Sequence, residues 1–146
     1  MSEAISFRQR LEGRFEGILR WPQLDELWAK LKQSKADWYF YQVGSPLPET
    51  TISADELAES INELDALLRH EHDYDYCGIV YTDNVKQPTL VKVYDPGNLG
   101  SSCSHPGAAS IPPRWIISRY PPEEIVDDAP TPNNRKRWWN QLFRLR

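Results

Sequence analysis

Tyr76-Cys-Gly-Ile-Val-Tyr-Thr-Asp83 and Thr89-Leu-Val-Lys-Val-Tyr94 are the two stretches around which the fold of this chain is predicted to form. Both are rich in β-branched and aromatic residues, which pack well on a pleated surface. An asparagine follows the first stretch and a proline precedes the second, as is typical of a turn. The sequence therefore predicts a β-hairpin. Lys92 indicates the face of the second strand that is most exposed to water.

A helix is predicted over residues 7–20. Ser6 and Gln9 have the spacing of a capping box and precede apolar residues at helical intervals. Gly13 and Gly17 lie one turn apart in this segment, and each disfavours a helix. They indicate either a close-packed neighbour or a frayed helix.

Two further helices are predicted over residues 22–34 and 54–69. Pro22 suits the first turn of the earlier helix. Ser53 and Glu56 form a second capping box at the start of the later one. Both helices have an apolar stripe, and the remaining face of the second helix is acidic.

Two more strands are predicted over 37–43 and 114–120, which gives the order α-α-β-α-β-β-β. A strand–helix–strand connection favours a right-handed crossover and a parallel strand pair, whereas the hairpin adds antiparallel pairs. The predicted fold class is therefore α+β. It has two layers, with a mixed sheet of about four strands and the helices on one face.

Charge divides the 146-residue chain into an acidic body and a basic end. Residues 49–75 hold nine acidic residues and one arginine, whereas residues 135–146 hold five of the 17 basic residues and none of the 21 acidic ones. We expect one globular domain over 1–126, a linker over 127–134 and a basic amphipathic C-terminal tail over 135–146. The net charge of −4 argues against a nucleic-acid partner.

Cysteine use and hydropathy predict a cytoplasmic protein. Cys77 and Cys103 do not make a disulfide framework. The N-terminal residues lack the apolar core of a signal peptide, and no apolar run approaches the ~18 residues of a membrane span. No residue pattern calls for a cofactor.

The tail is predicted to form a short amphipathic helix, because its apolar residues share one arc of a helical wheel. Three interpretations are open. The helix lies on an anionic membrane surface, which would make the protein peripheral to the membrane, or fills a groove of a partner protein, or docks on its own domain. The residues expected to bind a partner are Arg137, Trp138, Trp139, Leu142 and Phe143.

The long loop over 95–110 is rich in Gly, Ser and Pro, and loops of this length in a compact domain are often functional. Cys103 and His105 are candidates for a nucleophile and its base, although no third residue is evident to orient them. A ligand held by this loop would contact Asn98, Ser101, Ser102 and Arg119.

A second alternative is a metal site, because two histidines lie just before the predicted hairpin and a cysteine lies at its start. The spacing matches no standard zinc signature. A solvated polar loop beside an inert, buried Cys77 explains the same residues. The candidate ligands are His70, His72, Cys77, Cys103 and His105.

The leading functional interpretation is a non-catalytic accessory or adaptor protein. Its acidic domain binds one partner, and its basic Trp-rich tail recruits it to a second partner or to a membrane surface. The alternatives are a small-molecule-binding protein or enzyme with its site in the 95–110 loop, and a metal-binding domain.

Overall fold

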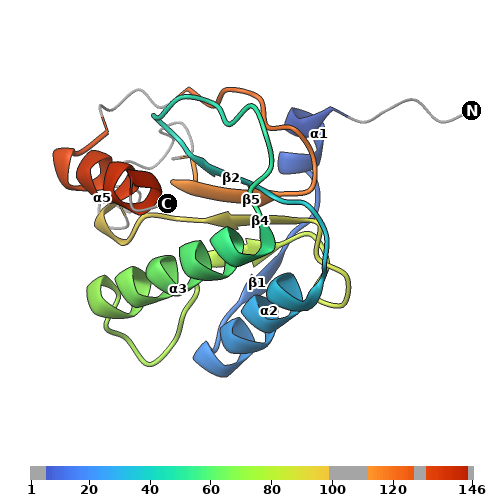
Figure 1. Ribbon diagram of the computed structural model, residues 1–146. Coiled ribbons are helices and arrows are strands. Elements are labelled where there is room, and N and C mark those ends of the chain that lie inside the picture. The colour runs from blue at the N-terminus through green and yellow to red at the C-terminus, as the bar shows by residue number, and fades with distance from the viewer. Residues whose placement is uncertain (1–5, 99–111, 127–130, 145–146) are drawn as a thin grey trace, which may run out of the picture.

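A five-stranded sheet in the order β1-β3-β4-β5-β2 is the central layer of the computed structural model (Figure 1). The structure describes residues 6–98, 112–126 and 131–144. All strand pairs in these residues are antiparallel. The strands are β1 (Glu16–Ile18), β2 (Tyr39–Gln42), β3 (Val80–Thr82), β4 (Leu90–Val93) and β5 (Trp115–Ser118).

The predicted hairpin is confirmed as β3 and β4, with Val80 opposite Val93. Asp83 closes the connection between the two strands. Its carboxylate accepts hydrogen bonds from the backbone N–H groups of Thr89 at 2.9 Å and Leu90 at 3.1 Å. A single aspartate therefore fixes the start of β4, as expected for a side chain that hydrogen-bonds to nearby backbone.

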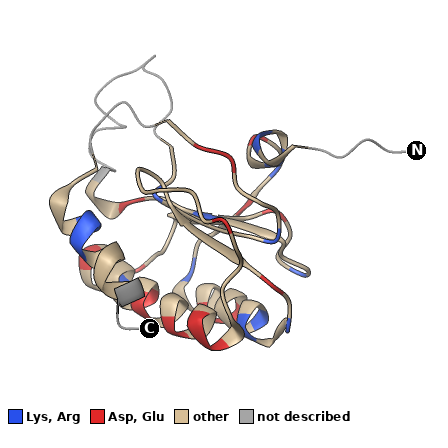
Figure 2. Cartoon of the chain, turned by 45° about the horizontal axis from the view of Figure 1, so that its top comes forward, with Lys and Arg blue, Asp and Glu red and all other residues tan. Residues whose placement is uncertain are grey.

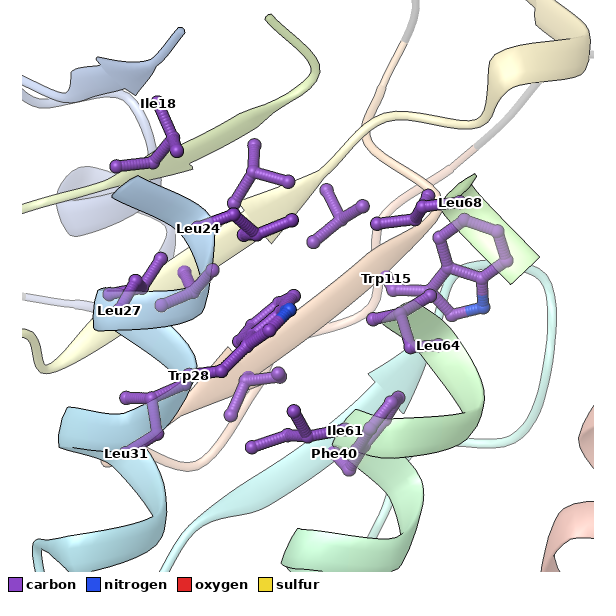
Figure 3. Packing of buried hydrophobic residues seen from close by; sticks show 14 of the residues in the cluster. Ile18, Leu24, Leu27, Trp28, Leu31, Phe40, Ile61, Leu64, Leu68 and Trp115 are labelled. Carbon is purple, nitrogen blue, oxygen red and sulfur yellow. The ribbon is translucent and has the colours of Figure 1, made fainter. Parts of the chain in front are cut away.

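Two helices, α2 (Trp21–Gln33) and α3 (Ala54–Glu71), cover one face of the sheet (Figure 1). Figure 3 shows their leucines and isoleucines against the aromatic side chains of the sheet. Burial of each such side chain stabilises the fold by about 1.5–3 kcal/mol. The labelled members of this core are Ile18, Leu24, Leu27, Trp28, Leu31, Phe40, Ile61, Leu64, Leu68 and Trp115.

The opposite face is covered by the short helix α1 (Phe7–Leu11), which lies on the far side of the sheet from α2 and α3 (Figure 1). Phe7 is buried there in a second cluster with Leu90 and Ile116. The prediction that the helices lie on one face therefore holds for α2 and α3 but not for α1.

The helix expected over residues 7–20 is wrong in its second half. It ends at Leu11, and Glu16–Ile18 is the edge strand β1, paired with β3. Gly17 lies opposite Tyr81, and a Cβ on Gly17 would be 3.2 Å from the Tyr81 ring. The close-packed neighbour indicated by the glycine is therefore this tyrosine.

The α+β class is confirmed, with five strands instead of about four, but the expected parallel pair is wrong. The chain from β1 through α2 reaches β2 at the opposite edge of the sheet, and α3 then leads back to β3. Strands joined by these helices are therefore not neighbours. Three antiparallel pairings separate β3 from β2 (β3 with β4, β4 with β5, and β5 with β2), so these two strands run in opposite directions and the crossover rule for parallel strands does not apply to the connection through α3.

The chain ends in η1 (Pro96–Asn98), β5 and the helix α5 (Asn133–Arg144). The rings of Trp138 and Trp139 contact Trp115 and Phe40, which belong to the core under α2 and α3. The C-terminal helix therefore packs on the same face of the sheet as those two helices.

Candidate functional site

Acidic residues lie along α3 (Figure 2) and continue into the segment that follows it, and together they are here called the acidic surface. Asp55, Glu63, Asp73 and Asp75 are exposed there. No salt bridge joins Asp73 or Asp75 to a basic side chain within the described parts of the chain. Asp73 and Asp75 therefore present negative charge that no basic side chain of the described residues neutralises.

Arg69 is the basic residue within this acidic surface, and it pairs locally. Its guanidinium lies 2.6 Å from Asp25 on α2 and 3.0 Å from Asp65 on its own helix. It also lies over the Trp21 ring, 4.8 Å from the ring centre. Such exposed pairs contribute little stability, but they fix the positions of the charges between α2 and α3.

Next to the acids is a group of large apolar side chains, here called the aromatic corner and defined as Leu19, Trp21, Tyr74 and Tyr76, of which Trp21 is half-buried and the other three are exposed. Tyr74 and Tyr76 are stacked with ring centres 5.7 Å apart. They are 59% and 53% exposed, and Leu19 is 61% exposed. Large apolar side chains that are grouped and exposed in this way mark interaction surfaces.

Hydrogen bonds to backbone carbonyls hold the aromatic corner in place. The Trp21 indole N–H donates to the Tyr74 carbonyl at 2.8 Å, and the Cys77 N–H donates to the Leu19 carbonyl at 2.8 Å. The corner therefore joins the segment before α2 to the segment after α3. Its tyrosines lie on a fixed platform, so a partner would not have to order them.

His72 lies under this platform and is buried. Its Nε2 is 2.7 Å from the Cys77 carbonyl oxygen, so this nitrogen carries the proton and donates to the carbonyl. Its ring also meets the Tyr74 ring edge-on, with ring centres 4.8 Å apart. His72 is therefore a structural support for the tyrosines.

The metal-ligand candidates are not brought together in the part of the chain that the structure describes. The Nε2 of His72 is hydrogen-bonded to the Cys77 carbonyl oxygen, and His70 is exposed. Burial raises the pKa of the Cys77 thiol, which disfavours the thiolate that binds a metal. No cluster of three or more His, Cys, Asp or Glu side chains suited to a metal occurs there. Cys103 and His105 lie outside the described residues.

The structure describes the surroundings of only one ligand-binding candidate, Arg119. The backbone of Asn98 ends η1, and Ser101 and Ser102 lie outside the described residues, as do the nucleophile and base candidates. The Arg119 guanidinium donates to the Asp37 carbonyl at 3.0 Å and lies 5.7 Å from the centre of the Trp38 ring. Arg119 therefore anchors β5 to the segment before β2.

The tail helix is held by Arg135, which is only 4% exposed. Its guanidinium donates two hydrogen bonds to Glu71, at 2.6 and 2.9 Å. It donates two more to Asp95, at 2.8 and 3.0 Å, and Asp95 also accepts from Arg114 at 3.2 Å. A planar guanidinium suits such bidentate pairing, so Arg135 links α5 to the end of α3 and to the segment after β4.

The carboxylates of this cluster are held ionised. Burial alone would raise the pKa of Asp95, but hydrogen bonds from Arg135 and the Gly97 N–H, with the charges of Arg135 and Arg114, lower it below its ordinary value. The hydrogen bond from Arg135 lowers the pKa of Glu71, more than partial burial raises it. Protonation of either carboxylate would therefore weaken the attachment of α5.

Of the three interpretations of the tail, the structure has the arrangement in which the helix docks on its own domain. Trp138 and Trp139 are half-buried, with ring centres 5.7 Å from Trp115 and 5.3 Å from Phe40. Leu142 is buried, whereas Arg137 is exposed. The side chain of Phe143 lies outside the described residues.

The sequence analysis predicts neither the aromatic corner nor the ion-pair cluster of Arg135, Glu71, Asp95 and Arg114, here called the Arg135 cluster. The stretch from His70 to Cys77 was considered for metal binding, although its alternation of Asp with Tyr was the available signal for an exposed aromatic surface. The partners of Arg135 lie 40 and 64 residues away along the chain, and no local pattern identifies them.

No helix in the described residues is both long enough and apolar enough to cross a membrane. Comparison of the chain with models of protein families, with curated proteins and with solved structures gave no match. The chemistry of the surface itself is therefore the basis for a proposal about function.

Proposed function

We propose that the chain is a non-catalytic accessory or adaptor protein whose acidic surface and aromatic corner together bind a basic segment of a partner protein. The observation that carries this proposal is the stacked pair Tyr74 and Tyr76, which is more than half exposed. Asp73 and Asp75 flank the pair and form no salt bridge within the described ranges. Tyrosine and arginine, together with tryptophan, are the side chains that most often dominate the energetics of protein interfaces.

Charge and ring chemistry complement each other at this surface. An arginine of the partner that lay on the face of a tyrosine would be held by cation–π attraction, worth about 0.5–2 kcal/mol. The neighbouring carboxylates would accept its hydrogen bonds. Acids farther along α3 would steer a basic segment toward the corner and raise the association rate at low salt.

The protein already binds one segment of this chemistry, namely its own C-terminal helix. Glu71 and Asp95 hold the Arg135 guanidinium, and Trp115 meets the Trp138 ring. This intramolecular contact supports basic, aromatic chemistry as the kind of segment that the acidic domain accepts.

The tail contributes a second surface in this proposal. Lys136 and Arg137 are exposed on α5, so the docked helix presents positive charge to a second partner. We favour an acidic protein over a membrane as that partner. The reason is that Trp138 and Trp139, which a membrane surface would need, face the core instead.

The proposal is tested by photo-crosslinking in the cells that make the protein. A benzophenone amino acid replaces Tyr76 in one variant and Leu47 in a control. Leu47 is exposed but follows β2 at the opposite edge of the sheet. The expected result is a crosslinked protein that is specific to position 76 and carries the crosslink on a basic segment.

The identified protein is then purified and its affinity is measured for the wild type and for the Tyr74→Ser/Tyr76→Ser variant. We expect the variant to bind at least about tenfold more weakly, with Leu47→Ser unchanged. Equal crosslinking at positions 76 and 47, or equal affinity of the tyrosine variant and the wild type, would overturn the proposal.

A further inference from the structure

An open pocket of about 350 Å³ lies on the face of the sheet opposite α2 and α3. Leu90 lies two residues before Lys92 on β4, so both side chains are on the same face, and Leu90 is buried with Phe7 and Ile116 in the cluster on the α1 side of the sheet. The volume falls in the usual range of small-molecule sites, about 300–1,000 Å³. The residues that line the pocket are Phe15, Gly78, Ile79, Tyr81, Lys92 and Tyr94.

Lys92 is the charged group of this pocket. The sequence predicted that it faces water, but it is half-buried, with Nζ 4.0 Å from the centre of the Phe15 ring. Its hydrogen-bond partner is the Leu11 carbonyl oxygen, at the long distance of 3.5 Å. No carboxylate forms an ion pair with it in the described residues.

Burial without a countercharge is costly for an ammonium group. It lowers the pKa of Lys92, which shows that the site disfavours the charged amine as it stands. An anion beside Nζ would remove that cost and would bring hydrogen-bond acceptors for an ammonium that has three protons to donate.

Aromatic rings form the walls of the pocket. The Tyr81 and Tyr94 rings meet edge to face, with centres 5.7 Å apart and planes at 82°. Tyr81 lies across Gly17 of β1, where a side chain would crowd its ring. The Phe15 ring faces the Lys92 ammonium. Such walls favour a flat apolar body.

We propose that this pocket binds a small molecule in which a flat aromatic or unsaturated body carries one carboxylate. The carboxylate pairs with Lys92 Nζ in a charge-assisted hydrogen bond, and the body packs against Phe15, Tyr81 and Tyr94. A single lysine without an arginine fork suits one negative charge better than a phosphate. The site shares no residue with the aromatic corner or with the Arg135 cluster, so it stands independently of the proposed function.

The test uses 2-naphthoate as the probe and 2-naphthamide as its neutral isostere. Each is titrated into the ¹⁵N-labelled full chain, and amide shifts and dissociation constants are recorded by NMR. The variant Lys92→Met removes the charge and keeps the apolar stem. Lys86→Met is the matched control, because Lys86 is exposed in the hairpin connection between β3 and β4.

We expect saturable shifts centred on Gly78, Ile79 and Tyr94, and at least about tenfold tighter binding of 2-naphthoate than of 2-naphthamide, as one charge-assisted bond would give. Lys92→Met should abolish this preference, and Lys86→Met should retain it. If the wild type binds 2-naphthoate and 2-naphthamide with equal affinity, this result alone would overturn the proposal. Shifts away from the pocket, or a preference that survives in a folded Lys92→Met, would overturn it too.

Discussion

Replacement of Arg135 by methionine tests whether α5 is an integral part of the fold. Methionine keeps most of the apolar stem and removes the guanidinium that joins Glu71 and Asp95. Arg135 and Asp95 are 4% and 3% exposed, so solvent screens their interaction little. Loss of one partner of a buried ion pair costs about 3–5 kcal/mol.

The cost is reduced here because Asp95 is not left alone. It keeps the hydrogen bond from Arg114 at 3.2 Å and that from the Gly97 N–H at 2.9 Å. We therefore expect the free energy of unfolding to fall by about 2–3 kcal/mol, or Tm by roughly 6–9 °C for a chain of this size.

The assay is urea unfolding followed by circular dichroism and tryptophan fluorescence. The matched control is Arg137→Met, in the same helix but exposed, which should change stability by less than about 0.5 kcal/mol. If α5 detaches before the sheet unfolds, the fluorescence of Trp138 and Trp139 should shift to the red ahead of the ellipticity change. Equal stability of the two variants would refute the role of the Arg135 cluster.

Three further predictions concern the Arg135 cluster, Gly44 and the tail tryptophans. The pKa values of Asp95 and Glu71 are lowered in the folded protein, so their contribution to stability is complete above the ordinary carboxyl pKa of about 4 and is lost as the pH falls below it. The difference in Tm between the wild type and Arg135→Met should therefore become smaller when Tm is measured at successively lower pH. Gly44→Ala should lower the free energy of unfolding by about 1–2 kcal/mol, since Gly44 has φ of +97° and a Cβ there would collide with Thr131, and Thr131→Ala should restore part of that loss in urea titrations. The full chain should not co-sediment with anionic vesicles, because its tail tryptophans contact the core, whereas vesicle binding equal to that of the isolated tail peptide would contradict the docked arrangement.

Periodic segments with clear end signals were predictable from the sequence. The capping box of Ser53 and Glu56 starts α3, and its apolar stripe is buried as expected. The hairpin followed from β-branched residues on both sides of the turn that Asp83 closes. In these segments the local preferences and the tertiary packing agree.

β1 was not predictable, because a three-residue strand lies inside an apolar pattern that also suits a helix. Gly13 and Gly17 disfavour a helix in this segment, but only the pairing of Gly17 with Tyr81 shows which side chain Gly17 accommodates. The predicted parallel pair was wrong for a related reason, because the partner of β2 is β5, more than seventy positions later in the chain. Tertiary contacts decide such choices, and no local pattern records them.

The tail illustrates the same limit at the level of the site. The amphipathic pattern of the tail identified Trp138, Trp139 and Leu142 as part of the apolar face of the helix that becomes buried, but it does not identify the surface on which this face packs. The answer depends on Asp95 and Glu71, which meet only when α3, β4 and β5 are assembled.

The central claim is that the acidic surface and the aromatic corner bind a basic segment of a partner. The most direct measurement is the affinity of the crosslinked partner for the wild type and for Tyr74→Ser/Tyr76→Ser, each from low to high salt. The account predicts an affinity that falls as salt rises and is at least about tenfold weaker in the variant at every salt concentration. An affinity that neither salt nor the two tyrosines change would contradict it.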